Sequence, residues 1–132
     1  MLLSLRIWVK IEALWSADDF RKLIEKIDFW IITGAALIKR NAFLNFNRFS
    51  PELGAFADGY LVRKIGFSEK TLFLPKIGLI WRRMPEGLSV STLVNNAVFK
   101  IKLENYEILS KKEKILSEKY IVQFLKRMQF YR

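Results

Sequence analysis

The sequence contains neither cysteine nor histidine among its 132 residues. The absence of cysteine excludes disulfide bonds and thiolate chemistry, and the absence of both residues excludes the usual zinc sites. Histidine is also the commonest general base in enzymes, so its absence removes one ordinary route to catalysis. The glycines form no phosphate-binding loop of the pattern G-x-x-x-x-G-K-[ST] or G-x-G-x-x-G. We therefore expect no enzyme, with no catalytic residue, metal, cofactor or small-molecule substrate.

Acidic residues are few relative to basic ones. Asp and Glu together number 13 and Lys and Arg number 23, which leaves a formal net charge of +10. Such a surplus on a short chain indicates a partner with many negative charges, either a nucleic acid or an anionic membrane surface. Hydrophobic residues still make up 52% of the chain, which is enough to bury a core. We therefore expect a small folded domain rather than a disordered basic tail.

Long uncharged hydrophobic runs are also missing. The opening residues "MLLSLRIWVKIEALW" are apolar, but Arg6, Lys10 and Glu12 interrupt them. The run therefore falls short of the roughly 18 uncharged apolar residues that a membrane span needs, and no small-residue cleavage site follows it. We expect no transmembrane segment and no cleaved presequence, and we predict a first structural helix over residues 2–15.

The segment "SADDFRKLIEKIDFWIITG" at residues 16–34 has the clearest helical pattern in the chain. Ser16 and Asp19 have the spacing of a capping box, Ser-x-x-Asp, which starts a helix. The neighbouring carboxylates Asp18 and Asp19 favour the positive end of the helix dipole, so we interpret them as capping residues and not as catalytic acids. Apolar residues then recur at i, i+3, i+4 and i+7 and predict one buried face: Phe20, Leu23, Ile24 and Ile27.

Shorter elements are predicted downstream. Residues 29–32 are typical of a buried strand that ends in a turn at Thr33-Gly34, and residues 35–49 fit either a short helix or a strand. Turn signals at Ser50-Pro51 and Asp58-Gly59 precede a predicted strand from Tyr60 to Arg63. Residues 71–84 and 93–103 carry β-type residues, with clean alternation over 98–103. A second Ser-x-x-Glu pattern, from Ser110 to Glu113, predicts a long basic helix to the end of the chain.

The basic residues are the strongest functional signal. Arginine and lysine neutralise phosphates, and aromatic rings stack on exposed bases, so interleaved basic and aromatic residues favour RNA binding. A single charged residue more often solvates a helix face, and a single aromatic residue more often fills a core. The collective charge nevertheless favours a polyanion. The candidate RNA-binding residues are Lys10, Arg21, Lys22, Lys26, Lys39, Arg40, Arg48, Arg63, Lys64, Arg82 and Arg83, and the interleaved aromatics are Trp8, Trp15, Trp30, Phe46, Tyr60 and Trp81.

Residues 16–34 also resemble a family pattern. Ser16-x-x-Asp19-Phe20-Arg21-Lys22-Leu23-Ile24, followed by Phe29-x-Ile31 and Thr33-Gly34, is similar to S-x-x-[DE]-A-R-[QK]-L-I-x-x-G-x-V-x-V-N-G. That pattern is the second helix and first strand of the RNA-binding module named after small-subunit ribosomal protein four. Phe20 replaces its alanine, Ile27 replaces its glycine, and the strand is one residue longer.

Two later blocks extend the resemblance. Pro51-x-x-x-Ala55-x-x-Asp58-Gly59-x-Leu61 is similar to the family's P-S-x-x-V-x-x-G-D-x-I, with Asp and Gly exchanged. "GLIWRRMPEGLS" (78–89) and "VNNAVFKIKLENY" (94–106) resemble the G-x-x-x-R-x-P-E stretch and the closing strand of the ribosomal protein. The blocks occur in the family's order and cover most of residues 3–106, although the gap before the second is about ten residues longer than usual.

The resemblance implies an α+β fold: a two-helix plus short-strand RNA-binding module (1–66), a small β region (67–106) and a basic C-terminal helical extension (107–132). It implies a structural constituent of the small ribosomal subunit that binds small-subunit rRNA and contacts neighbouring subunit proteins. Arg21, Lys22 and Arg82 are the candidates that match the family's motifs, and the others follow from charge.

The family's long segment ahead of the module is absent from this sequence, so we expect either that this segment is lost or that a separate chain supplies it. Phe, Ile, Lys and Asn enrichment favours a mitochondrial, organelle-encoded member located in the matrix. Two alternatives remain open. One is a free-standing RNA-binding regulatory or ribosome-rescue factor, and the other is a basic peripheral membrane protein that uses residues 2–15 and the terminal helix.

Overall fold

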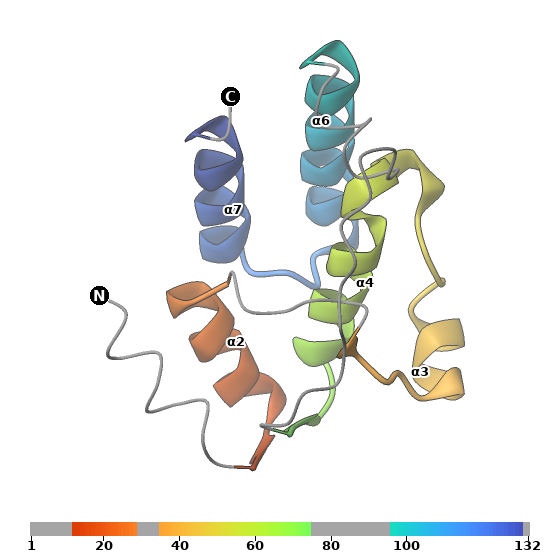
Figure 1. Cartoon of the computed structure of the whole chain (residues 1–132), viewed down its shortest axis with the longest axis vertical. Helices are drawn as coiled ribbons and strands as arrows, with labels where there is room; N and C mark the ends of the chain where they lie inside the picture. Colours follow the sequence, from red (N-terminus) through yellow and green to blue (C-terminus); the bar gives the residue numbers. More distant parts are fainter. Residues whose placement is uncertain (1–11, 29–34, 75–95, 131–132) are drawn as a thin grey trace.

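The computed structural model describes residues 12–28, 35–74 and 96–130, and its fold is α+β (Figure 1). The expected strand at 29–32 and its turn lie outside the described residues, as do residues 1–11 and 75–95. The elements in chain order are β1 (Ala13–Trp15), α2 (Ala17–Lys26), α3 (Arg40–Asn45), the 3-10 helix η2 (Pro51–Phe56), α4 (Ala57–Gly66), β2 (Thr71–Phe73), α6 (Asn96–Glu113) and α7 (Glu118–Phe130).

Helix α2 forms as predicted. The Ser16 hydroxyl accepts a hydrogen bond from the Asp19 backbone N–H and donates one to the Asp19 carboxylate. The hydrogen bond from the Ser16 hydroxyl to the carboxylate lowers the pKa of Asp19, because it favours the charged form. Phe20 and Ile24 are fully buried on the predicted apolar face, and Leu23 and Ile27 are partly buried beside them. The helix therefore follows from local sequence signals.

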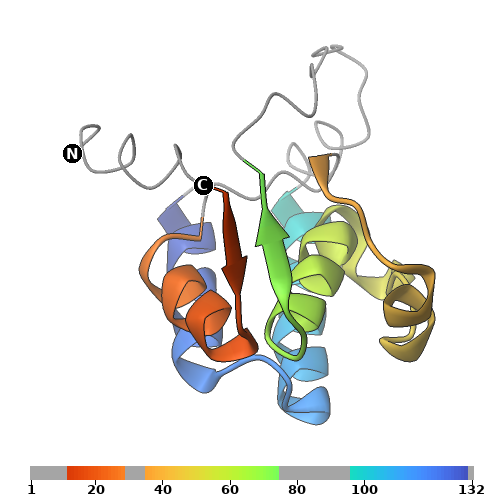
Figure 2. The same cartoon turned by 90° about the horizontal axis from the view of Figure 1, so that it is seen from below.

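The predicted first helix is wrong at its carboxyl end. Ala13–Trp15 is a strand, and it pairs antiparallel with Thr71–Phe73 in a two-stranded sheet. Trp15 stacks on Phe73 across this pair, with ring centroids 5.4 Å apart. Figure 2 shows the two strands side by side. Because the partner strand lies far along the chain, the local helical periodicity of residues 2–15 did not reveal the pairing.

The predicted strand at Tyr60–Arg63 is also wrong. These residues belong to α4, and Asp58-Gly59, read as a turn, forms the first turn of that helix. Tyr60 and Leu61 are buried, and Lys64 one turn later is buried as well. The burial of this helix face outweighs the β propensity of "YLV" because propensity is the weaker effect.

The alternating segment at 98–103 is helical too, and it opens α6. Phe99, Leu103, Tyr106 and Ser110 are its buried residues, at a helical spacing that runs well beyond the six alternating positions. Ser110 lies inside α6 and does not cap a terminal helix. The cap belongs to Ser117, whose hydroxyl accepts from the Tyr120 backbone N–H as α7 begins. The described carboxyl-terminal part of the chain therefore holds two helices, α6 and α7, and not the one helix predicted from Ser110.

The core lies between α2, α4, α6 and α7. Figure 1 shows α6 and α7 side by side, with α4 beside α6, α2 against the beginning of α7, and α3 at the outer edge. Tyr106 and Phe124 stack at a centroid distance of 4.2 Å, and the hydroxyls of Tyr106 and Tyr120 lie 3.2 Å apart. Burial raises the pKa of both tyrosines, so both remain protonated and can share this hydrogen bond.

Candidate nucleic-acid interface

Arg63 is one of the predicted RNA-binding residues, but its side chain is only 11% exposed. Its Nε donates to Asp28 Oδ1 at 2.5 Å, and its Nη2 donates to the Asp28 backbone oxygen at 3.1 Å. Arg127 Nη2 donates to the other oxygen of the same carboxylate at 2.5 Å. Asp28 therefore joins the end of α2 to α4 and α7, and Arg63 serves the fold.

Lys64 is buried even more completely, with 1% of its side chain exposed. Its Nζ lies 2.9 Å from each carboxylate oxygen of Glu113, and the Tyr60 hydroxyl donates to the same carboxylate at 2.7 Å. The Lys64 ammonium also lies 5.4 Å from the centre of the Tyr60 ring. Lys64 and Arg63 are thus held in ion pairs within the fold, and we exclude both from the candidate interface.

The α2 cations, Arg21, Lys22 and Lys26, are exposed. Arg21 pairs with Asp18 at 2.6 Å. Because the helix also carries Asp18, Asp19 and Glu25, it has as many acids as bases and no net charge. A nucleic-acid backbone would meet both positive and negative side chains on α2, so the α2 cations do not form a surface that favours a polyanion.

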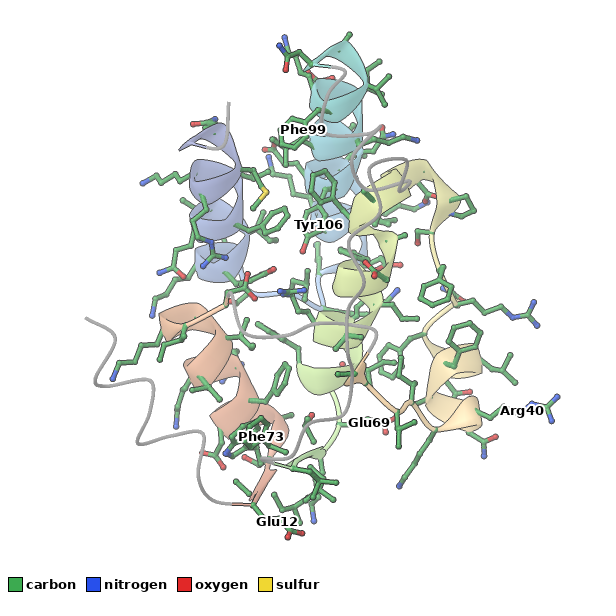
Figure 3. All side chains as sticks on the ribbon, in the orientation of Figure 1. Glu12, Arg40, Glu69, Phe73, Phe99 and Tyr106 are labelled. Atoms are coloured by element: carbon green, nitrogen blue, oxygen red, sulfur yellow. The ribbon has the colours of Figure 1, made fainter. Side chains whose placement is uncertain are left out.

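The α3 cations, Lys39, Arg40 and Arg48, occupy a different environment. All three are exposed, and residues 29–51 contain no Asp or Glu at all. Within the described part of the chain, the side chains of these three residues form no ion pair and no hydrogen bond. Figure 3 shows Arg40 extending outward from α3, and Figures 1 and 2 place α3 and α2 on opposite sides of the molecule. The structure therefore divides the predicted cations into two separate surfaces.

The positions of the α3 cations are costly for local structure. Lys39 is the N-cap of α3 and makes no side-chain cap hydrogen bond, and Arg40 follows in the first turn, where the helix dipole disfavours a cation. Arg48 has φ of 58° and follows Asn47 at 62°, both in the left-handed region. A non-glycine residue there costs on the order of 1 kcal/mol. Residues that lower local stability without improving the packing are typical of functional positions.

A groove of about 450 Å³ lies beside this surface. The segment after α3 forms one wall and the carboxyl end of α6 forms the other, and the lining residues are Asn47, Phe49, Ser50, Pro51, Glu52, Leu109, Lys112 and Glu113. Lys112 and Lys114 are exposed at this end of α6, whereas Lys111 pairs with Glu107 at 2.6 Å. Lys112 lines the groove directly, and Arg48 lies in the chain between two lining residues, Asn47 and Phe49. We call these five residues, Lys39, Arg40, Arg48, Lys112 and Lys114, the basic surface.

The site residues predicted from the sequence do not include Phe49, Lys112 or Lys114. The sequence feature that indicates the first wall of the groove is the stretch at 29–51, which contains no Asp or Glu. The net charge of the whole chain does not reveal this local excess of positive charge. Lys112 and Lys114 join it only through the packing of α6 against η2.

Three of the aromatic residues proposed for base stacking lie in the described ranges, and each is buried or half-buried. Trp15 stacks on Phe73, Tyr60 is buried, and Phe46 is half-buried at the end of α3. Phe49, by contrast, is 47% exposed. The candidate residues Lys10, Arg82 and Arg83 and the aromatics Trp8, Trp30 and Trp81 lie outside the described residues.

The described ranges contain neither an acidic cluster suited to a metal ion nor a helix suited to a membrane span. No group of three or more acidic side chains there is arranged to hold a metal ion. No helix in those ranges has both the length and the hydrophobicity to cross a membrane.

Comparison with known proteins gives no relative. No protein-family model, curated protein or solved structure matches this chain.

Proposed function

We propose that this protein binds structured RNA through the basic surface and acts as a constituent of a ribonucleoprotein particle. The observation that carries the proposal is the set of exposed, unpaired cations on an acid-free segment, Lys39, Arg40 and Arg48. Phosphate groups would replace the water around these side chains and release condensed counterions, which makes binding favourable and dependent on salt. The asparagines Asn41, Asn45 and Asn47 are exposed on the same segment and add hydrogen-bond donors.

The sequence, through its resemblance to the ribosomal family, supports the further proposal that this particle is the small ribosomal subunit. The first family block favours small-subunit rRNA as the partner and the small ribosomal subunit as the site of action, and the composition favours mitochondria. Helix α2 begins at the capped Ser16, as the module's second helix would. The later blocks give weaker support, because Tyr60–Arg63 and 98–103 are helical where the family has strands.

The test compares two triple variants of the full chain that have the same net charge. Lys39→Glu, Arg40→Glu and Arg48→Glu change the basic surface, and Arg21→Glu, Lys22→Glu and Lys26→Glu change α2. Binding to a small-subunit rRNA fragment is measured over a range of salt concentrations, and circular dichroism checks the fold of each variant.

We expect the α3 triple to weaken binding strongly and to reduce the slope of log affinity against log salt by about 2, since three phosphate contacts at roughly 0.7 each are lost. The α2 triple should weaken binding much less. Equal losses in the two variants would mean that net charge alone attracts RNA, and the assignment of the basic surface would then be wrong.

A second experiment separates a constituent from a transient factor. Mitochondrial small subunits are sedimented in high salt, which removes loosely bound proteins. A constituent stays on the subunit at one copy, whereas its loss would indicate a factor that visits the ribosome only transiently.

A further inference from the structure

The groove between the segment after α3 and the carboxyl end of α6 is large enough to receive one nucleotide. Ligand pockets in proteins begin at roughly 300 Å³, and this groove measures about 450 Å³. It lies between two segments of the basic surface, so an RNA backbone that contacts Arg48 and Lys112 would pass along its mouth.

Phe49 presents an aromatic ring to this groove. The ring is 47% exposed and meets Phe43 edge to face, with centroids 5.2 Å apart. Its position depends on the strained turn before it, in which the Arg48 backbone N–H donates to the Phe43 carbonyl at 3.0 Å. An exposed ring held by a strained but hydrogen-bonded turn is suited to stacking on a planar ligand.

The polar groups of the groove fit the rest of a nucleotide. Lys112 is exposed and has no ion-pair partner within the described residues, so its ammonium is available for a phosphate. The Asn47 amide can donate to and accept from the edge of a base, and the Glu52 carboxylate can accept from it. Glu113 does not compete for Lys112, because Lys64 and Tyr60 already occupy its carboxylate.

From this arrangement we infer that the groove receives a single unpaired nucleotide of the bound RNA, with its base stacked on Phe49 and its phosphate at Lys112. The inference rests on the proposed function, since the basic surface supplies the general affinity. The groove adds a preference for RNA with an unpaired nucleotide, which attraction between charges alone does not give. An RNA stem with one extruded nucleotide should bind more tightly than the same stem fully paired, because a base inside a helix cannot reach the ring.

The experiment uses two RNA hairpins that differ only in one bulged nucleotide, a fluorescent adenine analogue. Affinities of the full chain for both are measured at one salt concentration, together with the fluorescence of the bulge. Stacking on an aromatic side chain contributes about 1–3 kcal/mol per base. We therefore expect the wild-type protein to prefer the bulged hairpin by about 5- to 150-fold and to quench its fluorescence.

The variant Phe49→Leu keeps an apolar side chain but removes the ring. It should lose the preference and the quenching while its affinity for the paired hairpin changes by less than about twofold. Phe46→Leu, at a neighbouring aromatic position outside the groove, is the matched control and should keep the preference. Lys112→Met should weaken the bulged complex more than Lys100→Met, which changes an exposed lysine of the same helix.

The outcomes separate the two hypotheses. Failure of the protein to bind either hairpin would overturn the proposed function and the groove with it. Binding of both hairpins with equal affinity, or an unchanged preference in Phe49→Leu, would overturn the groove alone. Displacement of the bulged RNA by micromolar adenosine monophosphate would identify a free nucleotide as the ligand and would likewise overturn the inference.

Discussion

Replacing Lys64 with methionine tests whether this lysine serves the fold or binds RNA. Methionine keeps the length and apolar volume of the side chain but removes its charge. At 2.9 Å and an effective dielectric constant of about 20, the attraction between Lys64 and Glu113 is about 6 kcal/mol before desolvation. The variant leaves the Glu113 carboxylate with Tyr60 as its remaining partner in this network. Breaking a buried pair in this way typically costs about 3–5 kcal/mol of unfolding free energy.

The assay is urea denaturation followed by circular dichroism at neutral pH. Lys64→Met should lower the urea midpoint without changing the slope, and should lower the melting temperature by roughly 10–15 °C. The double variant Lys64→Met, Glu113→Gln should regain most of the lost stability, because it removes both charges while Gln can still accept from Tyr60. At a temperature where Lys64→Met is folded, its RNA affinity should equal that of the wild type.

The result that refutes this reasoning is specific. If Lys64→Met loses less than about 1 kcal/mol, the pair has the weak energy of a solvent-screened ion pair. If the variant is stable but loses RNA affinity, Lys64 belongs to the RNA-binding surface as its charge alone predicted.

Two further predictions concern the packing of α2. Gly66→Ala should lower the unfolding free energy by about 1–3 kcal/mol in urea titrations, because its Cβ would lie 2.2 Å from the Phe20 ring; unchanged stability would show that Phe20 can move away. The hydrogen bond from Ser117, at 2.6 Å, and the cation of Lys119, at 3.0 Å, lower the pKa of Glu25 below its ordinary 4.5. This contribution to stability is therefore present above about pH 4.5 and is lost as the pH falls through the lowered pKa. In melting-temperature profiles against pH, Glu25→Gln should be less stable than the wild type at neutral pH and approach it in acid, whereas a constant difference would contradict the assignment.

The sequence gives the charge of each residue but not whether the charged side chain is exposed. Lys39, Arg40 and Arg48 are identified as candidates by their type, and the structure leaves all three exposed. Arg63 and Lys64 have the same residue types and lie in the interior. Their partners, Asp28 and Glu113, are 35 and 49 residues away in the chain, and no local pattern connects them.

The misassigned strands have a related cause. Over six residues, positions 98–103 alternate like a strand, but over the whole of α6 the buried Phe99, Leu103 and Tyr106 follow a helical period. Because Ile101 and Ile108 are apolar but exposed, the helical period of α6 becomes clear from burial and not from the residue types alone. Ala13–Trp15 likewise depends on the tertiary structure, because its strand exists only where Thr71–Phe73 lies beside it.

The sequence by itself determined the net charge, which follows from residue counts, and α2, because a cap and an apolar face act within a few residues of the chain. Only the tertiary structure decided which cations are free. Burying a charge is tolerable when an opposite charge reaches it, and the packing of α4 in the fold supplied opposite charges, Asp28 to Arg63 and Glu113 to Lys64. The α3 cations received none, and for that reason they remain available to a partner.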